Sequence, residues 1–140
     1  MTDLCILYLL TDRDDIDVDC FPLQKREAIS VMEDDGKCHI VINPLMLRSN
    51  ADEKSKLAHE LGHCKTGSFY NQYTPYDVCQ KHENRADKWA IKKLVPKDEL
   101  EDAVAAGYTE PWELAELFDV TEDFMRKAIY WHTHGNLAME

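Results

Sequence analysis

Two histidines four residues apart, with a glutamate directly after the first, constrain this chain more than any other feature. They are His59, Glu60 and His63, within the sequence AHELGHC at residues 58–64. On a helix each residue turns about 100°, so the two imidazoles lie about 40° apart and the carboxylate about 60° further on. Imidazoles at this spacing are typical zinc ligands, and the adjacent carboxylate is placed to act as a general base. In a chain of this length and composition, the expected number of chance matches to this pattern is only about 0.02.

The helix that carries this motif can be bounded from its flanking residues. We expect Asn50 to cap its N-terminus, with Glu53 as the capping-box partner three residues later. Gly67 is expected to end it. The side opposite the histidines is apolar and is expected to face the core, through Leu57, Leu61 and Cys64.

A third metal ligand is expected from the next helix, predicted over residues 77–95. Glu83 falls on the same face of that helix as Ala86 and Ala90. A carboxylate on a core-facing stripe is costly unless it has a partner, and a metal held by the two histidines would be that partner. The small alanines would let the two helices lie close together.

Asp87, one helical turn after Glu83, is predicted to accept a hydrogen bond from the outer nitrogen of a ligating histidine. His82 and Cys79 are rival ligands, which helix geometry disfavours relative to Glu83. The alternative for Glu83 and Asp87 is an ordinary solvated charge pair on an amphipathic helix.

The loop between the two helices is rich in aromatic and amide side chains. Three of its tyrosines are candidates for stabilising an oxyanion or contacting a peptide: Tyr70, Tyr73 and Tyr76. The alternative for any one of them is a ring that covers the core.

In the first third of the chain, the sequence pattern predicts a short helix over residues 2–12 and a β-hairpin. The hairpin strands are expected at 28–32 and 38–42, on either side of an Asp-Gly turn. The strand at 38–42 is expected to offer the edge along which a substrate backbone could align. The acidic stretch 12–19 is expected to be exposed.

The last third predicts three helices, at 98–106, at 110–118 and after Thr121 as N-cap. Their apolar spacing resembles a helix-turn-helix, which raises the possibility of DNA binding. Residues 110–131 hold six acidic side chains but only two basic ones, Arg126 and Lys127. Phosphate would be repelled, so we interpret this unit as a packing or protein-docking module.

Overall charge and cysteine usage narrow the setting further. The formal net charge is −11, which disfavours nucleic acid and anionic membranes as partners. The five cysteines are odd in number and form no C-x-x-C pair, so no disulfide is expected. The short apolar run at residues 4–10 is not typical of a secretory signal. We therefore expect free thiols and a reducing, cytoplasmic location.

Two segments together resemble the ImmA/IrrE family of metallopeptidases: AHELGHCKTGSFY at 58–70 and ENRADKWAIKKLVP at 83–96. The resemblance implies a zincin-like minimal peptidase fold. Together with the elements predicted above, this gives an α+β class, mostly helical, with a small antiparallel sheet and a C-terminal helical, helix-turn-helix-like extension. The resemblance implies His59, His63 and Glu83 as metal ligands, with Glu60 as the catalytic base. The expected ion is one Zn²⁺ per chain, with another divalent metal as the alternative. The resemblance also implies a substrate, a helix-turn-helix repressor.

These inferences define the expected organisation and function. Residues 1–108 are predicted to form the zincin-like metallopeptidase domain, and residues 109–140 a helical extension packed on it. The expected activity is zinc-dependent hydrolysis of a peptide bond in a basic helix-turn-helix repressor of a mobile element. The main alternative is a non-proteolytic antirepressor with a structural metal. A DNA-binding regulator that uses residues 110–131 is a third possibility.

Overall fold

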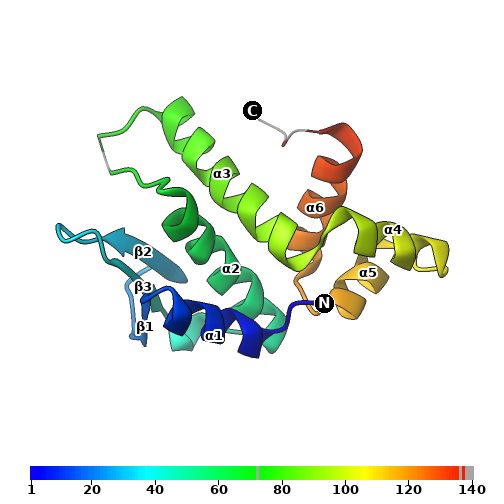
Figure 1. Cartoon of the computed structure of the whole chain (residues 1–140), viewed down its shortest axis with the longest axis horizontal. Helices are drawn as coiled ribbons and strands as arrows, with labels where there is room; N and C mark the ends of the chain where they lie inside the picture. Colours follow the sequence, from blue (N-terminus) through cyan, green and yellow to red (C-terminus); the bar gives the residue numbers. More distant parts are fainter. Residues whose placement is uncertain (72, 136, 138–140) are drawn as a thin grey trace.

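Six α-helices and one small sheet make up the part of the chain that this computed structural model describes, residues 1–71, 73–135 and 137 (Figure 1). In chain order these are α1 (Leu4–Arg13), β1 (Asp17–Cys20), β2 (Ala28–Met32), β3 (Cys38–Ile42), the short 3₁₀ helix η1 (Pro44–Met46), α2 (Asn50–Thr66), α3 (Tyr76–Leu94), α4 (Lys97–Ala105), α5 (Pro111–Phe118) and α6 (Glu122–His134). The predicted mostly helical α+β class is confirmed. Within the described residues, no helix has the length and apolar character needed to cross a bilayer.

The three strands lie in the order β1-β3-β2. The predicted hairpin is confirmed, because β2 and β3 pair antiparallel with Ala28 opposite Ile42. The expectation of a purely antiparallel sheet is wrong, because β1 joins β3 in parallel and makes the sheet mixed. The sequence did not predict β1, because aspartates alternate along it. Their carboxylates lie on the outer face, where Asp19 is 2.8 Å from the His39 ring.

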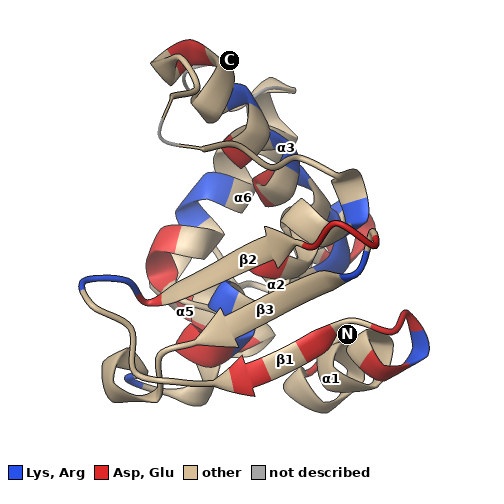
Figure 2. Cartoon of the chain, turned by 90° about the vertical axis from the view of Figure 1, so that its left-hand side faces the viewer, with Lys and Arg blue, Asp and Glu red and all other residues tan. Residues whose placement is uncertain are grey.

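The position of β3 corrects a second expectation. Because β3 pairs with strands on both sides, it offers no edge for a substrate. Within the described residues, β2 pairs only with β3, so its other side is unpaired. Figure 2 shows the strands in front of α2, whose residues contact β2 and β3. β2 is therefore one edge strand of the sheet, and β1 is the other.

Helix α2 is the central element and runs beside α3 (Figure 1). Its N-cap is Ser49, not the predicted Asn50, because the Ser49 hydroxyl accepts from the Asp52 amide at 3.1 Å. It ends as predicted at Gly67, which has a left-handed φ of 65°. On its apolar face Leu57 and Leu61 are fully buried and Cys64 is partly buried. The crossing with α3 is close because both helices present small residues to each other, Gly62 facing Ala86.

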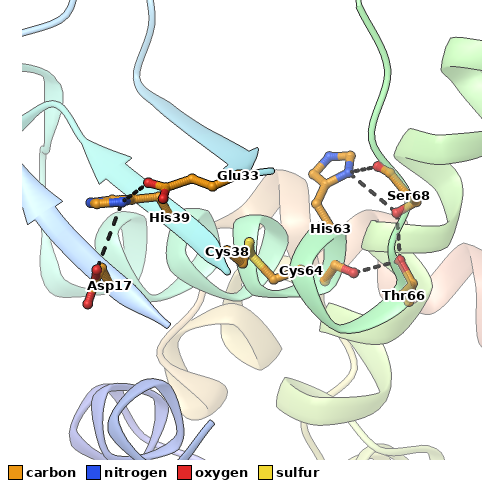
Figure 3. Close-up of a disulfide and its surroundings, with 9 residues drawn as sticks. Asp17, Glu33, Cys38, His39, His63, Cys64, Thr66 and Ser68 are labelled. Atoms are coloured by element: carbon orange, nitrogen blue, oxygen red, sulfur yellow. Dashed lines mark hydrogen bonds and ion pairs between the residues drawn. A yellow bond between two sulfur atoms is a disulfide. The ribbon is translucent and has the colours of Figure 1, made fainter. Parts of the chain in front are cut away.

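A disulfide between Cys38 and Cys64 ties the start of β3 to α2 (Figure 3). The expectation that all thiols stay free is wrong for this pair. The bridge joins residues 26 apart whose Cα atoms are 5.9 Å from each other, and local spacing gave no sign of it. The cytoplasmic expectation rested partly on free thiols, and it loses that support.

The C-terminal helices share the core of the rest of the chain. Leu114, Phe118 and Met125 are buried in the same apolar cluster as Leu57 and Leu61 of α2. The predicted Thr121 cap is confirmed, since its hydroxyl accepts from the Phe124 amide at 3.2 Å. The division of the chain at residue 108 stays a prediction.

Candidate metal centre

Helices α2 and α3 bring the three predicted ligand residues to one point. One ligand atom from each of His59, His63 and Glu83 lies within 4.8 Å of the others. The His59 Nε2 atom is 2.8 Å from Glu83 Oε2, and the His63 Nε2 atom is 3.2 Å from Glu83 Oε1. The two Nε2 atoms and the carboxylate therefore share one small space. Among the described residues this is the group that could hold a metal ion.

The outer nitrogen of each histidine is held by an oxygen acceptor. His59 Nδ1 lies 2.7 Å from Asp87 Oδ1, as the sequence predicted for Asp87. His63 Nδ1 donates to the Ser68 carbonyl oxygen at 2.5 Å (Figure 3). The Ser68 hydroxyl in turn contacts the Thr66 hydroxyl at 2.6 Å. These bonds fix each ring with Nε2 toward Glu83, the orientation that a metal ligand needs.

The donor set fits zinc. Two imidazole nitrogens and one carboxylate oxygen form a three-ligand set of the kind found at catalytic zinc sites, which keep a fourth position open. Gly62 lies between the two histidines in sequence, and its lack of a side chain lets α3 approach α2. The fit therefore depends on backbone packing as well as on the ligands.

Without a metal these groups form a tight cluster of opposite charges. Burial alone would lower the pKa of His59, but its hydrogen bonds with Asp87 and Glu83 outweigh burial and raise that pKa to about 10. The pKa of His63 is also raised, because Glu83 and the Ser68 carbonyl oppose burial. Burial disfavours the Glu83 carboxylate, yet the two histidines hold its pKa well below the usual value. A bound cation would replace these protons as the partner of Glu83.

Glu60 lies where two cavities meet. It is only 8% exposed and lines both of them. One cavity of about 930 Å³ also contains His59, and another of about 260 Å³ contains His63 and Glu83. Glu60 thus borders the space next to the ligands. This is where a general base for an attacking water would have to lie.

Of the three candidate tyrosines, the structure brings one to the ligands. The Tyr70 hydroxyl donates to Glu83 Oε1 at 2.6 Å, and burial followed by this bond raises the Tyr70 pKa. Tyr73 and Tyr76 are 84% and 70% exposed and do not line either cavity beside Glu60. Neither ring covers the core, so that alternative is wrong for these two residues, while their contact with a peptide stays a prediction.

The sequence did not identify two groups that contact the site. The Ser68 carbonyl is a backbone group, so no side-chain pattern could point to it. The second is Lys127, which lies on α6 in the C-terminal segment and donates to Asp87 Oδ2 at 2.9 Å. Its only sequence signal is that it is one of two cations in an acidic region. The contact depends on how α6 folds back over α3.

A histidine pair on one helix, a glutamate on the next helix and a small neighbouring sheet are features of zinc metallopeptidases. The chain belongs to the IrrE N-terminal-like domain family, peptidase M78, whose family model matches residues 11–130. The resemblance drawn from the two sequence segments is thereby confirmed. Family membership indicates a metallopeptidase. No curated protein compared with the chain matches it.

Proposed function

We propose that the chain is a zinc-dependent endopeptidase in which His59, His63 and Glu83 hold the metal and Glu60 is the general base. One observation carries the proposal. The three ligand atoms converge within 4.8 Å beside cavities that Glu60 lines. A metal with a purely structural role would not need a further carboxylate residue in the cavities next to its ligands.

The residues around the ligands have distinct tasks in this proposal. A zinc ion held there supplies Lewis-acid chemistry that polarises a peptide carbonyl and makes a nearby water more acidic. Glu60 accepts a proton from the attacking water and passes it to the leaving amine. Asp87 and the Ser68 carbonyl keep the two imidazoles in the required orientation. Tyr70 can donate to the negative charge that develops on the carbonyl oxygen.

The unpaired edge of β2 is suited to align the substrate backbone. Ala28, Ile29 and Ser30 line the same cavity as Glu60, His63 and Glu83. An extended peptide that adds to this edge would pass the catalytic carboxylate. Main-chain hydrogen bonds would then position the scissile bond without demanding a particular sequence.

The proposed substrate is a basic protein, a helix-turn-helix repressor of a mobile element, with the cytoplasm as the site of action. The repressor and its source rest on the family resemblance. Charge supports a basic partner, because the net charge of −11 attracts cationic surfaces and raises association rates. Direct DNA binding is not part of the proposal. Arg126 lies 2.8 Å from Glu122, whose carboxylate would repel a phosphate at the same place.

The test combines metal analysis with a cleavage assay on a candidate repressor, read by mass spectrometry. Glu60→Gln should keep stoichiometric zinc but produce no fragments. Glu83→Ala should lose zinc and activity together, while Glu101→Gln on the exposed face of α4 should change neither. Cleavage by Glu60→Gln at the parental rate would disprove the base assignment.

The same assay separates the protease from the antirepressor. Fragments that disappear when a chelator is added support hydrolysis. An intact complex of repressor and protein, with zinc bound and no fragments at any time, would instead support the non-proteolytic binder.

A further inference from the structure

A lysine from the C-terminal helix contacts the metal centre indirectly. Lys127 Nζ donates to Asp87 Oδ2 at 2.9 Å. The other oxygen of the same carboxylate, Oδ1, accepts from His59 Nδ1 at 2.7 Å. Asp87 is therefore held from both sides, by α2 through His59 and by α6 through Lys127. The chain of contacts runs from α6 through α3 to a proposed ligand on α2.

The environment of Asp87 explains why a second partner matters. The residue is only 6% exposed, so its carboxylate is largely withdrawn from water. An imidazole that binds a cation through Nε2 is itself neutral, so its Nδ1–H gives Asp87 a hydrogen bond, while the charge of the ion would lie on the far side of the ring. A buried carboxylate left without a counter-charge is strongly disfavoured. Lys127 provides that positive charge at the remaining oxygen.

The position of Lys127 also fits a partner of Asp87 better than a solvated side chain or a contact with DNA. Its side chain lines the same cavity as His59 and Glu60, with its charged end turned to Asp87. The adjacent cation, Arg126, points instead along the helix surface to Glu122. The two consecutive basic residues of α6 thus have separate partners, one within the site and one at the surface.

We propose that Lys127 is a positioning residue of the metal centre, which holds Asp87 so that His59 binds the metal in a fixed orientation. The inference rests on the proposed zinc site. It means that the C-terminal helix completes the centre rather than serving only as an appended docking module. Lys127 acts through Asp87 and His59, and it is not assigned a contact with substrate.

The experiment measures zinc affinity by competition with a chromophoric chelator, together with thermal unfolding of the metal-free protein. Lys127→Met should weaken zinc binding about tenfold, in the range seen when partners of a metal-ligating histidine are removed. Lys127→Arg, which keeps the charge, should restore affinity to within about threefold of the parent. Arg126→Met is the matched control and should bind zinc like the parent.

A comparison of zinc binding in single and double variants distinguishes this positioning role from a merely structural one. Asp87→Asn should weaken zinc binding, and adding Lys127→Met to it should weaken binding no further, because both changes break one chain of contacts. If Lys127→Met fails to fold, Lys127→Gln replaces it in the same measurements. Parental affinity in Lys127→Met, or equal losses in Lys127→Met and Lys127→Arg, would overturn the inference. Absence of zinc binding by the parent chain would overturn the proposed function itself.

Discussion

Gly62 on α2 and Ala86 on α3 are so close that a Cβ atom added to Gly62 would lie 2.8 Å from the Ala86 Cα and 2.9 Å from its carbonyl carbon. Real side chains do not tolerate such contacts, and the atoms they would meet belong to backbone. Gly62 separates the two histidines in sequence, and Ala86 lies between Glu83 and Asp87. This close approach of the two helices therefore lies at the centre of the site.

Gly62→Ala tests this relationship. In an isolated helix the change would stabilise by about 1 kcal/mol, through helix propensity. Here overpacking should dominate and destabilise the protein by about 1–3 kcal/mol, with weaker zinc binding because the helices must separate. Denaturant unfolding and zinc competition measure both effects. Adding Ala86→Gly should not rescue the variant, since the clash is with backbone atoms; full rescue would show that the side chain of Ala86 is the obstacle.

Tyr70→Phe is expected to reduce turnover while leaving zinc bound. Loss of an oxyanion donor typically costs about 10²–10³-fold in kcat, and the partly exposed Tyr70 should lie at or below the lower end of that range. Tyr73→Phe and Tyr76→Phe are the controls, because both rings are exposed and outside the site. Steady-state peptide cleavage and metal content distinguish the three. A fall in zinc content equal to the fall in rate would mean that Tyr70 supports Glu83 rather than the reaction.

Removal of the Cys38–Cys64 disulfide should lower stability. A bridge closing a loop of this size contributes about 3.5 kcal/mol in the chain-entropy account. Dithiothreitol should therefore shift the denaturation midpoint of the parent but not that of the Cys38→Ser/Cys64→Ser variant. Cys5→Ser, which changes an exposed free thiol, should respond to reductant like the parent. A parent midpoint that is unaffected by reductant would argue against the bridge.

Lys54 is buried to 1% exposure, and its ammonium donates to the Phe118 carbonyl at 2.7 Å. Lys54→Met keeps most of the volume and removes a buried charge, so its free energy of unfolding at pH 7 should lie within about 1 kcal/mol of the parent. Lys54→Ala leaves a cavity and should be less stable by about 2–4 kcal/mol. A loss in Lys54→Met as large as that in Lys54→Ala would show that the hydrogen bond outweighs packing.

The same residue gives a pH test. Burial lowers the pKa of Lys54 below the usual 10.5, despite the nearby Asp119 and Asp3. Its charged form therefore costs stability at neutral pH, and this cost disappears as the pH rises toward 10.5. The stability of the parent relative to Lys54→Met should increase between pH 7 and pH 10. Chemical denaturation of both proteins across that interval measures the difference, and a constant difference would contradict the lowered pKa.

Local patterns in the sequence predicted most of the fold. The hairpin followed from its turn, Gly67 ended its helix, and the small residues at 86 and 90 indicated close helix packing. The three ligand residues and Asp87 were identifiable because their spacing follows the helical repeat. Their approach to one another is a geometric fact of the structure, whereas their roles await the experiments above.

The features that the sequence did not predict depend on contacts between distant segments. Strand β1 has one partly buried apolar residue, Val18, between two aspartates, and it forms only because β3 offers a partner edge. The disulfide depends on α2 lying against the sheet. Lys127 looks like any solvated cation until α6 packs over α3. Helix capping by Ser49 rather than Asn50 is a shift of one residue, the usual precision of such boundaries.

The bridge between Cys38 and Cys64 has a practical consequence for cleavage assays. It closes a covalent ring that contains His59, Glu60 and His63 but leaves Glu83 outside. A single cut within the ring, by the chain itself or by an added protease, would leave the two fragments joined. Self-cleavage in the turn before α2 would then be invisible on a non-reducing gel, and would appear only as a second band after reduction.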